Sequence, residues 1–353
     1  MPQLNRRRFI QAAGAAGIVG LAGCSGGDGG SDGTTSVAVG IPSASTTTGA
    51  ASNSFQRVVN EQSGDTEPAG EIQWQNQETG GDPPSLRQYN QGNVRAMTGG
   101  NFIVASAIED LPPFKERGVE EVPHQMFSIA PLHMHIVSIQ GSGIETTDDL
   151  VGSNFWPLPP QWGLRQQVET VLENAGLWSD LQESDSIVDA GTGDVAGLIE
   201  EENIDALFCY GSGFANLPGW ATEVDARADL QLVEFSDDLI EGANSTRGTS
   251  HSVIDSYGWE QQEFNGDEVD VYGADFQFWL GSGVSRDVGY ELARISNENA
   301  ADIQEGQPAY LDHSDPEVMT SLYLESIPVH PGSYDFLEDE GVDMSAYTRG
   351  EVQ

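Results

Sequence analysis

Lysine is almost absent from this 353-residue chain, in which Lys115 is the single example. Lysine and arginine together number 14, against 56 aspartate and glutamate residues, so the formal net charge is −42. Nucleic-acid phosphates are neutralised by clustered basic residues, and their scarcity here excludes a nucleic-acid partner. Carboxylates at this density repel one another unless molar salt shortens the screening length to about 3 Å, which indicates an extracellular protein of a halophile.

Cysteine and long apolar runs are scarce as well. Only Cys24 and Cys209 occur, so no disulfide can form within the chain if Cys24 carries a lipid. The apolar run of residues 9–23 is rich in glycine and alanine, and it is shorter than the ~20 residues that span a bilayer. The sequence therefore predicts a globular part whose stability comes from its core and whose contact with a membrane is through a lipid anchor only.

The N-terminus has the layout of an export signal. Residues 6–10 read Arg-Arg-Arg-Phe-Ile, and residues 21–24 read Leu-Ala-Gly-Cys. A basic start, a short apolar stretch and small residues before a cut site are typical of a secretory signal, and paired arginines indicate the twin-arginine route. We expect residues 1–23 to be removed, Cys24 to be lipidated, and residues 24–35 to form a flexible polar tether. The alternative is an ordinary signal cut nearby, with Cys24 a bystander.

Apolar periodicity alternates between strand and helix over the rest of the chain. Strands are expected at residues 36–41, 71–77, 132–139, 153–158, 203–209, 230–235 and 268–280, and helices at residues 50–62, 85–91, 163–174, 194–201 and 286–305. Alternation of this kind predicts an α/β fold with mostly parallel sheets flanked by helices.

Residues with catalytic potential are few. His133 and His135 alternate on a predicted strand, so both rings face one side and a metal pair is conceivable. No cysteine or acidic pair has the spacing to complete such a site, and we favour two hydrogen-bonded histidines of an interior strand. The nucleophile elbow, the P-loop and the dinucleotide fingerprint are all missing. We therefore expect no catalytic residues, no metal and no cofactor, and we do not expect an enzyme.

Polar loops at strand-to-helix turns are better candidates, because ligands of such sheets bind outside the carboxyl ends of the strands. Hydroxyls and free N–H groups before a helix suit an anion, although the same pattern also caps a helix. Arg165 could clamp a carboxylate through two hydrogen bonds, or it could form a surface ion pair. The candidate ligand-binding residues are Ser43, Ser45, Thr46, Thr47, Thr48, Thr79, Gly80, Asn101, Gln161, Trp162, Arg165, Tyr210 and Phe214.

The order of these segments resembles the TAXI family of solute receptors, which serve TRAP-type secondary transporters. The stretches that carry the resemblance include Val39–Thr48, Thr79–Gly81, Leu132–Val137, Asn203–Phe208 and Pro328–Gly332, and the likeness runs from residue 36 to about residue 342. Two stretches depart from the family pattern. Residues 45–48 replace a Gly-Gly-Thr-Tyr-Tyr loop, and residues 161–164 replace the Gly-Ser-Gly-Thr before the arginine. We interpret His330-Pro331-Gly332 as a structural, helix-terminating turn.

The resemblance implies a two-lobed, periplasmic-binding-protein-like fold (type II) with the ligand cleft between the lobes. Lobe 1 would comprise residues 36–138 plus 236–345 and lobe 2 residues 139–235, with hinges near residues 132–139 and 230–235.

The function that the resemblance implies is that of a solute receptor. The protein would be a lipoprotein of the haloarchaeal type, held at the extracellular face of the cytoplasmic membrane. It would capture a small organic solute, an amino acid or another carboxylate, and deliver it to a multi-spanning TRAP-type subunit. The alternatives are a receptor for an ATP-driven (ABC) importer and a secreted metal-dependent hydrolase that uses His133 and His135.

Overall fold

The structure is a computed structural model that describes residues 33–64, 68–264 and 268–353. By its contacts the chain divides into Met1–Gly33 and a compact unit, Thr34–Gln353, which carries the fold. The predicted signal peptide, Cys24 and residues 24–32 of the tether lie outside the described residues. Among the helices that are described, none has both the length and the apolar character needed to cross a bilayer.

A single sheet runs through this unit. Within the described residues it has nine strands in the order β2-β1-β3-β9-β4-β6-β5, with β7 paired to β4 and β8 paired to β9. The strands are β1 (Thr34–Ile41), β2 (Glu71–Glu78), β3 (Ala96–Gly100), β4 (His124–Ile139), β5 (Phe155–Trp156), β6 (Ala206–Ser212), β7 (Leu230–Leu232), β8 (His251–Asp255) and β9 (Glu268–Leu280).

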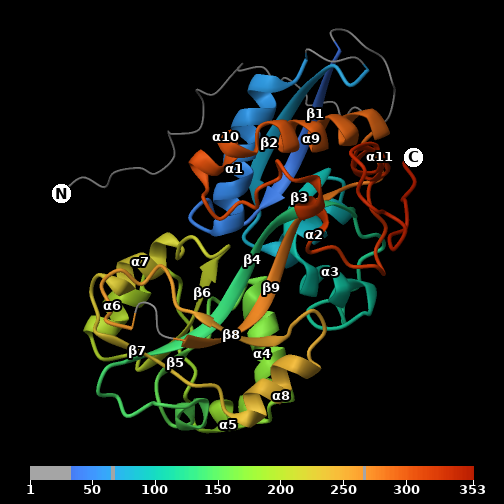
Figure 1. Cartoon of the computed structure of the whole chain (residues 1–353). Helices are drawn as coiled ribbons and strands as arrows, with labels where there is room; N and C mark the ends of the chain where they lie inside the picture. Colours follow the sequence, from blue (N-terminus) through green and yellow to red (C-terminus); the bar gives the residue numbers. More distant parts are fainter. Residues whose placement is uncertain (1–32, 65–67, 265–267) are drawn as a thin grey trace, which may run out of the picture. The chain divides into compact units, whose positions relative to one another are not determined.

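Helices flank this sheet (Figure 1). They are α1 (Thr47–Gln62), α2 (Asp82–Asn90), α3 (Asn101–Ile108), α4 (Gly163–Asn174), α5 (Leu177–Glu183), α6 (Val195–Glu200), α7 (Gly219–Asp225), α8 (Asp237–Ser245), α9 (Arg286–Glu298), α10 (Ala300–Gly306) and α11 (Pro331–Asp339), with 3-10 turns η1 (Thr147–Leu150) and η2 (Pro316–Thr320). The α/β prediction is therefore confirmed, and helix 163–174 and strand 268–280 have the predicted bounds. The helix predicted over residues 286–305 is two helices, because the backbone leaves the helical conformation at Asn299.

The longest strands, β4 and β9, lie side by side as an antiparallel pair (Figure 1). Their register runs from His124 opposite Leu280 to Met134 opposite Tyr272, with two irregularities in β4 before Ala130. Both strands contribute to two separate hydrophobic clusters. One cluster is formed around Phe55, Phe127 and Phe278, and the other around Trp156, Tyr210 and Trp259. We name the parts built around these clusters lobe 1 and lobe 2.

The strands pass from one lobe to the other at a different place from the predicted hinges. On β4, Ala130 belongs to the core of lobe 1 and Leu132 to that of lobe 2; on β9 the change falls between Phe276 and Phe278. Residues 132–138 and 236–276, expected in lobe 1, thus contribute to the core of lobe 2. The return strand is β9, whereas β7 has three residues and pairs with the far end of β4.

The sheet is also less parallel than the alternating pattern predicted. Among the described strands, three pairings are parallel, β1 with β2, β1 with β3, and β5 with β6. The other five are antiparallel, and each of them involves β4 or β9. The difference from the predicted, mostly parallel arrangement is therefore due to the two crossing strands, β4 and β9.

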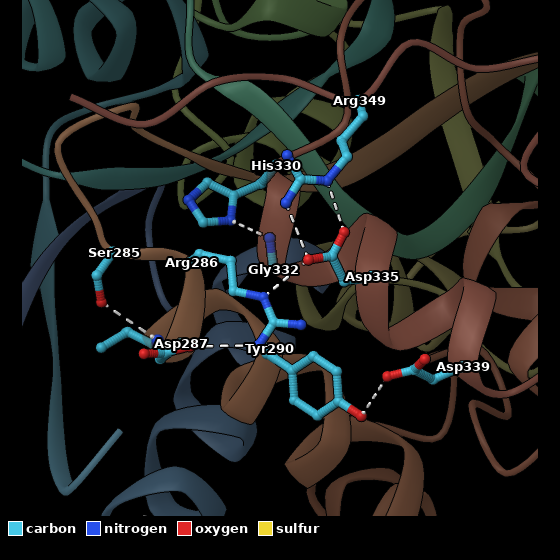
Figure 2. Close-up of polar contacts among 10 residues, drawn as sticks. Ser285, Arg286, Asp287, Tyr290, His330, Gly332, Asp335, Asp339 and Arg349 are labelled. Atoms are coloured by element: carbon cyan, nitrogen blue, oxygen red, sulfur yellow. Dashed lines mark hydrogen bonds and ion pairs between the residues drawn. The ribbon is translucent and has the colours of Figure 1, made fainter. Parts of the chain in front are cut away.

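His330 lies in lobe 1, where α9 packs on α11 (Figure 2). Its Nδ1 accepts a hydrogen bond from Gly332 N at 3.2 Å, and its Nε2–H donates to Val284 O at 3.1 Å. The imidazole therefore caps the N-terminus of α11. The structural interpretation of this segment holds, but the segment begins a helix and does not end one.

Beside this cap, Asp335 accepts hydrogen bonds from Arg286 and Arg349 (Figure 2). The guanidinium group of Arg349, and to a smaller extent that of Arg286, lowers the pKa of Asp335. The C-terminal segment is in this way fastened to both α9 and α11.

Replacing His330 by alanine is expected to lower the free energy of unfolding by about 2–4 kcal/mol, because Val284 O and Gly332 N–H lose their partners at a buried site. Burial lowers the pKa of His330 to about 4. His330 therefore stays neutral in the folded protein at pH values below about 6.5, where the same side chain is protonated in the unfolded chain. The free energy of unfolding falls as pH drops from 6.5 towards 4. His330→Ala should weaken this pH dependence, as measured by urea unfolding at constant molar salt.

The control is His251→Ala in lobe 2, whose ring is paired with the half-buried Asp270. A loss for His330→Ala no larger than that of the control would contradict the structural role of His330.

Candidate functional site

A pocket lies where the two lobes meet the crossing strands. Its volume is about 30 Å³, which is room for roughly two water molecules. It is lined by Pro42, Thr46, Thr47, Thr48, Gly81 and Asp82 of lobe 1, by Trp162, Gly163, Leu164 and Tyr210 of lobe 2, and by Leu132 and Phe276 of the crossing strands. A larger hollow of about 280 Å³ near Tyr89 and Ser282 is bounded by lobe 1 alone. We take the pocket between the lobes as the candidate site, because it uses the loop-to-helix turns of both.

The hydroxyl loop before α1 supplies one wall of the pocket. Thr46 is the N-cap of α1, and its Oγ1 accepts a hydrogen bond from Gly49 N at 3.1 Å and donates one to Ser43 O at 2.7 Å. Its hydroxyl is therefore used by the loop, as the capping alternative predicted. The Thr48 hydroxyl has no hydrogen-bond partner among the described residues, so it is available to a ligand.

Thr47 joins the two lobes. Its hydroxyl lies 2.6 Å from the hydroxyl of Ser212, at the end of β6, and this hydrogen bond is buried. A second contact between the lobes runs from Asn216 Nδ2 to Gln307 Oε1 at 3.3 Å. The lobes therefore touch directly beside the pocket, which corresponds to a closed cleft.

Asp82 is the charged side chain of the pocket wall. It is the first residue of α2, directly after the positive-φ pair Gly80-Gly81, and its side chain is 4% exposed. Its Oδ2 accepts a hydrogen bond from Gly100 N at 3.0 Å. Burial raises the pKa of Asp82 to about 7, although the bond from Gly100 opposes the shift. The group can therefore lose or gain a proton near neutral pH.

Opposite Asp82, the first residues of α4 bring lobe 2 into contact with lobe 1. A β-carbon at Gly163 would lie 2.7 Å from Ile103 Cγ1 and 2.8 Å from Asp82 Oδ2, so any larger residue would have to displace these side chains. Trp162 and Leu164 flank it, and Tyr210 and Phe276 complete the apolar wall. Burial raises the pKa of the Tyr210 phenol, which therefore stays neutral.

Five of the predicted ligand-binding residues line the pocket, namely Thr46, Thr47, Thr48, Trp162 and Tyr210. The structure does not bring the others to it. Ser43 and Ser45 are exposed and bond each other at 3.0 Å. Thr79 bonds Ser85 within its own turn, beside the exposed Gly80.

Asn101 and the lobe 2 candidates also lie outside the pocket lining. The amide of Asn101 bonds Leu322 O and Gln277. Gln161 is exposed, as is Phe214, whose ring packs 4.3 Å from that of His133.

Arg165 is directed into lobe 2. Its Nη1 donates to Leu158 O at 2.8 Å and lies 3.1 Å from Asp189, and its Nε lies 2.7 Å from Glu169. The guanidinium also stacks on Trp178. The ion-pair alternative therefore describes Arg165 better than the carboxylate clamp, except that the guanidinium is buried.

The two strand histidines are engaged by hydrogen bonds. His135 Nδ1–H donates to His133 O at 2.9 Å, and its Nε2 accepts from Trp259 Nε1 at 3.2 Å. His133 Nδ1 lies 2.7 Å from the Tyr257 hydroxyl. Burial lowers the pKa of both, that of His135 to about 4. Within the described part of the chain, no group of three or more histidine, cysteine or acidic side chains is placed to hold a metal.

Sequence reasoning missed several lining residues, namely Pro42, Gly81, Asp82, Leu132, Gly163, Leu164 and Phe276. A signal was present for Asp82. It is an acid directly after two glycines and directly before Pro83-Pro84, at the start of a predicted turn to a helix. No such signal marked Leu132 and Phe276, which reach the pocket only because β4 and β9 cross beside it.

The chain belongs to the NMT1-like family, whose model matches residues 47–341. The match begins at the first residue of α1 and covers lobe 2, most of lobe 1 and the cap at His330. No curated protein matches the chain.

Solved structures with low sequence identity align over most of the chain. One is the periplasmic aliphatic sulphonate binding protein of Escherichia coli, with 13% identity, 88% of this chain and 81% of that chain covered, and a TM-score of 0.38. Another is a ligand-binding component of an ABC-type import system from Staphylococcus aureus, with 9% identity, coverages of 89% and 96%, and a TM-score of 0.43. A TRAP solute binding protein from a marine metagenome, in complex with 3-hydroxybenzoate, shares 14% identity with coverages of 91% and 85% and a TM-score of 0.40. The family assignment rests on the family model alone.

Arg165→Ala is expected to lower the free energy of unfolding by about 2 kcal/mol, because Leu158 O and two carboxylates lose a buried partner. Solute affinity of the folded variant should stay close to that of the wild type in calorimetry. A tenfold weaker affinity, about 1.4 kcal/mol, without a loss of stability would restore Arg165 as a ligand clamp.

Gly163→Ala is expected to hold the lobes apart, because the added methyl group would overlap Asp82 and Ile103 only in the closed form. We expect the affinity for solute to fall by about tenfold, since closing the cleft becomes costly, and small-angle scattering to report a larger radius of gyration.

Gly219→Ala is the matched control, because Gly219 is also the first residue of a lobe 2 helix and a β-carbon there meets no atom within 4 Å. Equal effects of the two substitutions would contradict the closure argument.

Proposed function

We propose that this protein is an extracytoplasmic receptor that captures a small solute between its lobes and delivers it to a TRAP-type, ion-coupled membrane transporter. The observation that carries the proposal is the pocket itself. Its walls come from the N-terminal turns of α1 and α2 in lobe 1, from α4 and β6 in lobe 2, and from both crossing strands. A solute held there touches both lobes and can stabilise their closure.

The crossing strands suit such a movement. Pro131 of β4 lies opposite Asp275 of β9, at the point where the strands leave one core for the other, and the irregularities of β4 lie just before it. Bulges and a proline weaken the ladder locally. The cleft can therefore open about this point while each core stays packed, and opening breaks the bond between Thr47 and Ser212.

The TRAP-type partner is proposed from the resemblance to the TAXI family. A receptor for an ATP-driven importer is the second candidate, and neighbouring genes separate the two: one would encode a fused multi-spanning subunit, the other an ATPase. The hydrolase alternative finds little support, because both ring nitrogens of His135 are used in hydrogen bonds.

The location proposed is the outer face of the cytoplasmic membrane, after twin-arginine export, with a lipid on Cys24. A tethered receptor stays near its transporter, and the acidic surface suits high salt. We expect Cys24→Ala to release the protein into the medium with its binding activity intact, as measured by fractionation and immunoblotting. Retention of the variant in the membrane fraction would contradict the anchor.

The receptor function is tested by native mass spectrometry of protein purified in high salt, which should reveal a co-purified small solute. Deleting the gene should then abolish uptake of that solute by whole cells. Uptake that continues unchanged in the deletion strain would rule the receptor function out.

A further inference from the structure

We propose that the pocket binds the cationic head of its solute, an ammonium or amidinium group, with Asp82 as its counter-ion and Trp162, Tyr210 and Phe276 as its walls. The inference rests on the proposed receptor function and adds the chemical class of the solute. It replaces the carboxylate expected from the sequence, an expectation drawn from the family resemblance, the hydroxyl-rich loop and Arg165.

The charges around the pocket support a cation. The lining contains one carboxylate, that of Asp82, and no lysine, arginine or histidine. The nearest arginine in sequence, Arg165, is bound by Glu169, Asp189 and Leu158 O. An anionic solute would therefore enter a small, mostly apolar space beside a carboxylate and without a basic side chain to pair with, so only the N-terminal N–H groups of the helices would oppose the repulsion from Asp82.

Asp82 itself lacks a cationic partner. Among the described residues, its carboxylate has one hydrogen bond, from Gly100 N to Oδ2. A buried carboxylate held this way is destabilised in its charged form, which is why its pKa is raised to about 7. A cation placed in the pocket would supply the missing partner and return the pKa of Asp82 to lower values.

The aromatic walls suit the same ligand. Trp162 directly precedes α4, Tyr210 lies on β6 and Phe276 lies on β9, so lobe 2 and a crossing strand contribute the rings, and lobe 1 contributes Asp82. Ring faces attract cations, most strongly when water is excluded. The Phe276 ring and Asp82 Oδ2 lie close to the same point, 3.3 and 3.5 Å from the position of a β-carbon on Gly100. A small head bound beside Asp82 would thus meet this ring.

The alternative hypothesis is that Asp82 is protonated and donates a hydrogen bond to a carboxylate of the solute. The two hypotheses differ in pH dependence. A cation needs ionised Asp82, so its affinity rises as pH increases through about 7, whereas a carboxylate needs the protonated acid and loses affinity over the same range.

The groups that face Asp82 from the neighbouring elements do not change their charge over the pH range of this test. They are the hydroxyls of Thr46, Thr47 and Thr48 at the start of α1, Gly100 N of β3, Gly163 of α4, Phe276 of β9 and the Tyr210 phenol of β6. Tyr210 is the titratable one among them. Burial above all, with smaller contributions from Cys209 and Asp82, raises the pKa of its phenol, which stays neutral in this range.

Acetamidinium, acetamide and acetate are the probes, because they share size and planar shape and differ in charge. Binding to the wild-type protein is measured by ligand-observed NMR at constant high salt, at several pH values between 6 and 8. We expect acetamidinium to bind at least about tenfold more tightly than the other two, with an affinity that rises with pH. Methylammonium and tetramethylammonium then show whether the head is a bare or a methylated ammonium.

Asp82→Asn keeps the shape of the side chain and removes its charge. We expect acetamidinium to lose at least about tenfold in affinity and its pH dependence to disappear. Asp225→Asn is the matched control. Asp225 is buried in lobe 2, where it accepts hydrogen bonds from the backbone N–H groups of Glu260 and Gln261, and it does not line the pocket. This variant should bind acetamidinium as the wild type does.

Three results would each overturn the inference: tighter binding of acetate than of acetamidinium, no binding of any cationic probe by folded wild-type protein, or unchanged acetamidinium binding in Asp82→Asn. The receptor function is decided separately, by the co-purified solute and the uptake assay. A co-purified carboxylate that carries no cationic group and whose uptake requires this gene would keep the receptor function and contradict the cation.

Discussion

The antiparallel ladder between β4 and β9 is the constraint on which the rest of the structure depends. Each of these two strands supplies side chains to both hydrophobic cores, so the core of each lobe requires both β4 and β9. The ladder also fixes where the lobes face each other. The turns into α1 and α2 come to lie opposite the start of α4 and the end of β6, and Leu132 and Phe276 close the space between them. The pocket is thus a consequence of the crossing.

In the closed cleft the two lobes approach each other closely, and this closure buries the carboxylate of Asp82. Gly163 lets α4 approach Asp82 and Ile103, and Thr47 bonds Ser212 across the lobes. The same closure removes water from Asp82 and leaves its charge with a single hydrogen bond. A structure that buries a carboxylate in this way pays in stability unless a ligand compensates, and such sites are where function is concentrated. The buried polar side chains of His135, His330 and Arg165 are, by contrast, paired.

Much of the local structure could be predicted from the sequence, because periodicity and capping act over a few residues. Helix 163–174 and strand 268–280 have their predicted bounds. Thr46 caps α1, which is the alternative to anion binding that the sequence also allowed. Asn299 was missed as a helix break, since the apolar pattern continues across it. Of the residues that line the pocket, Thr46, Thr47, Thr48, Trp162 and Tyr210 were among the predicted ligand-binding residues. The sequence could not decide between the two alternatives for Arg165, because a guanidinium and its possible partners look the same in sequence whether they face a ligand or a core.

The sequence by itself determined the α/β class, the scarcity of basic residues and the turns that carry polar side chains, because these follow from composition and short-range spacing. The strands that cross between lobes, the boundary between the two cores and the neighbours of Asp82 were decided only by the tertiary structure. Those features depend on pairing between segments more than 130 residues apart, such as β4 and β9. Burial, which alone turns Asp82 from a surface acid into a proposed counter-ion, is a property of that long-range arrangement.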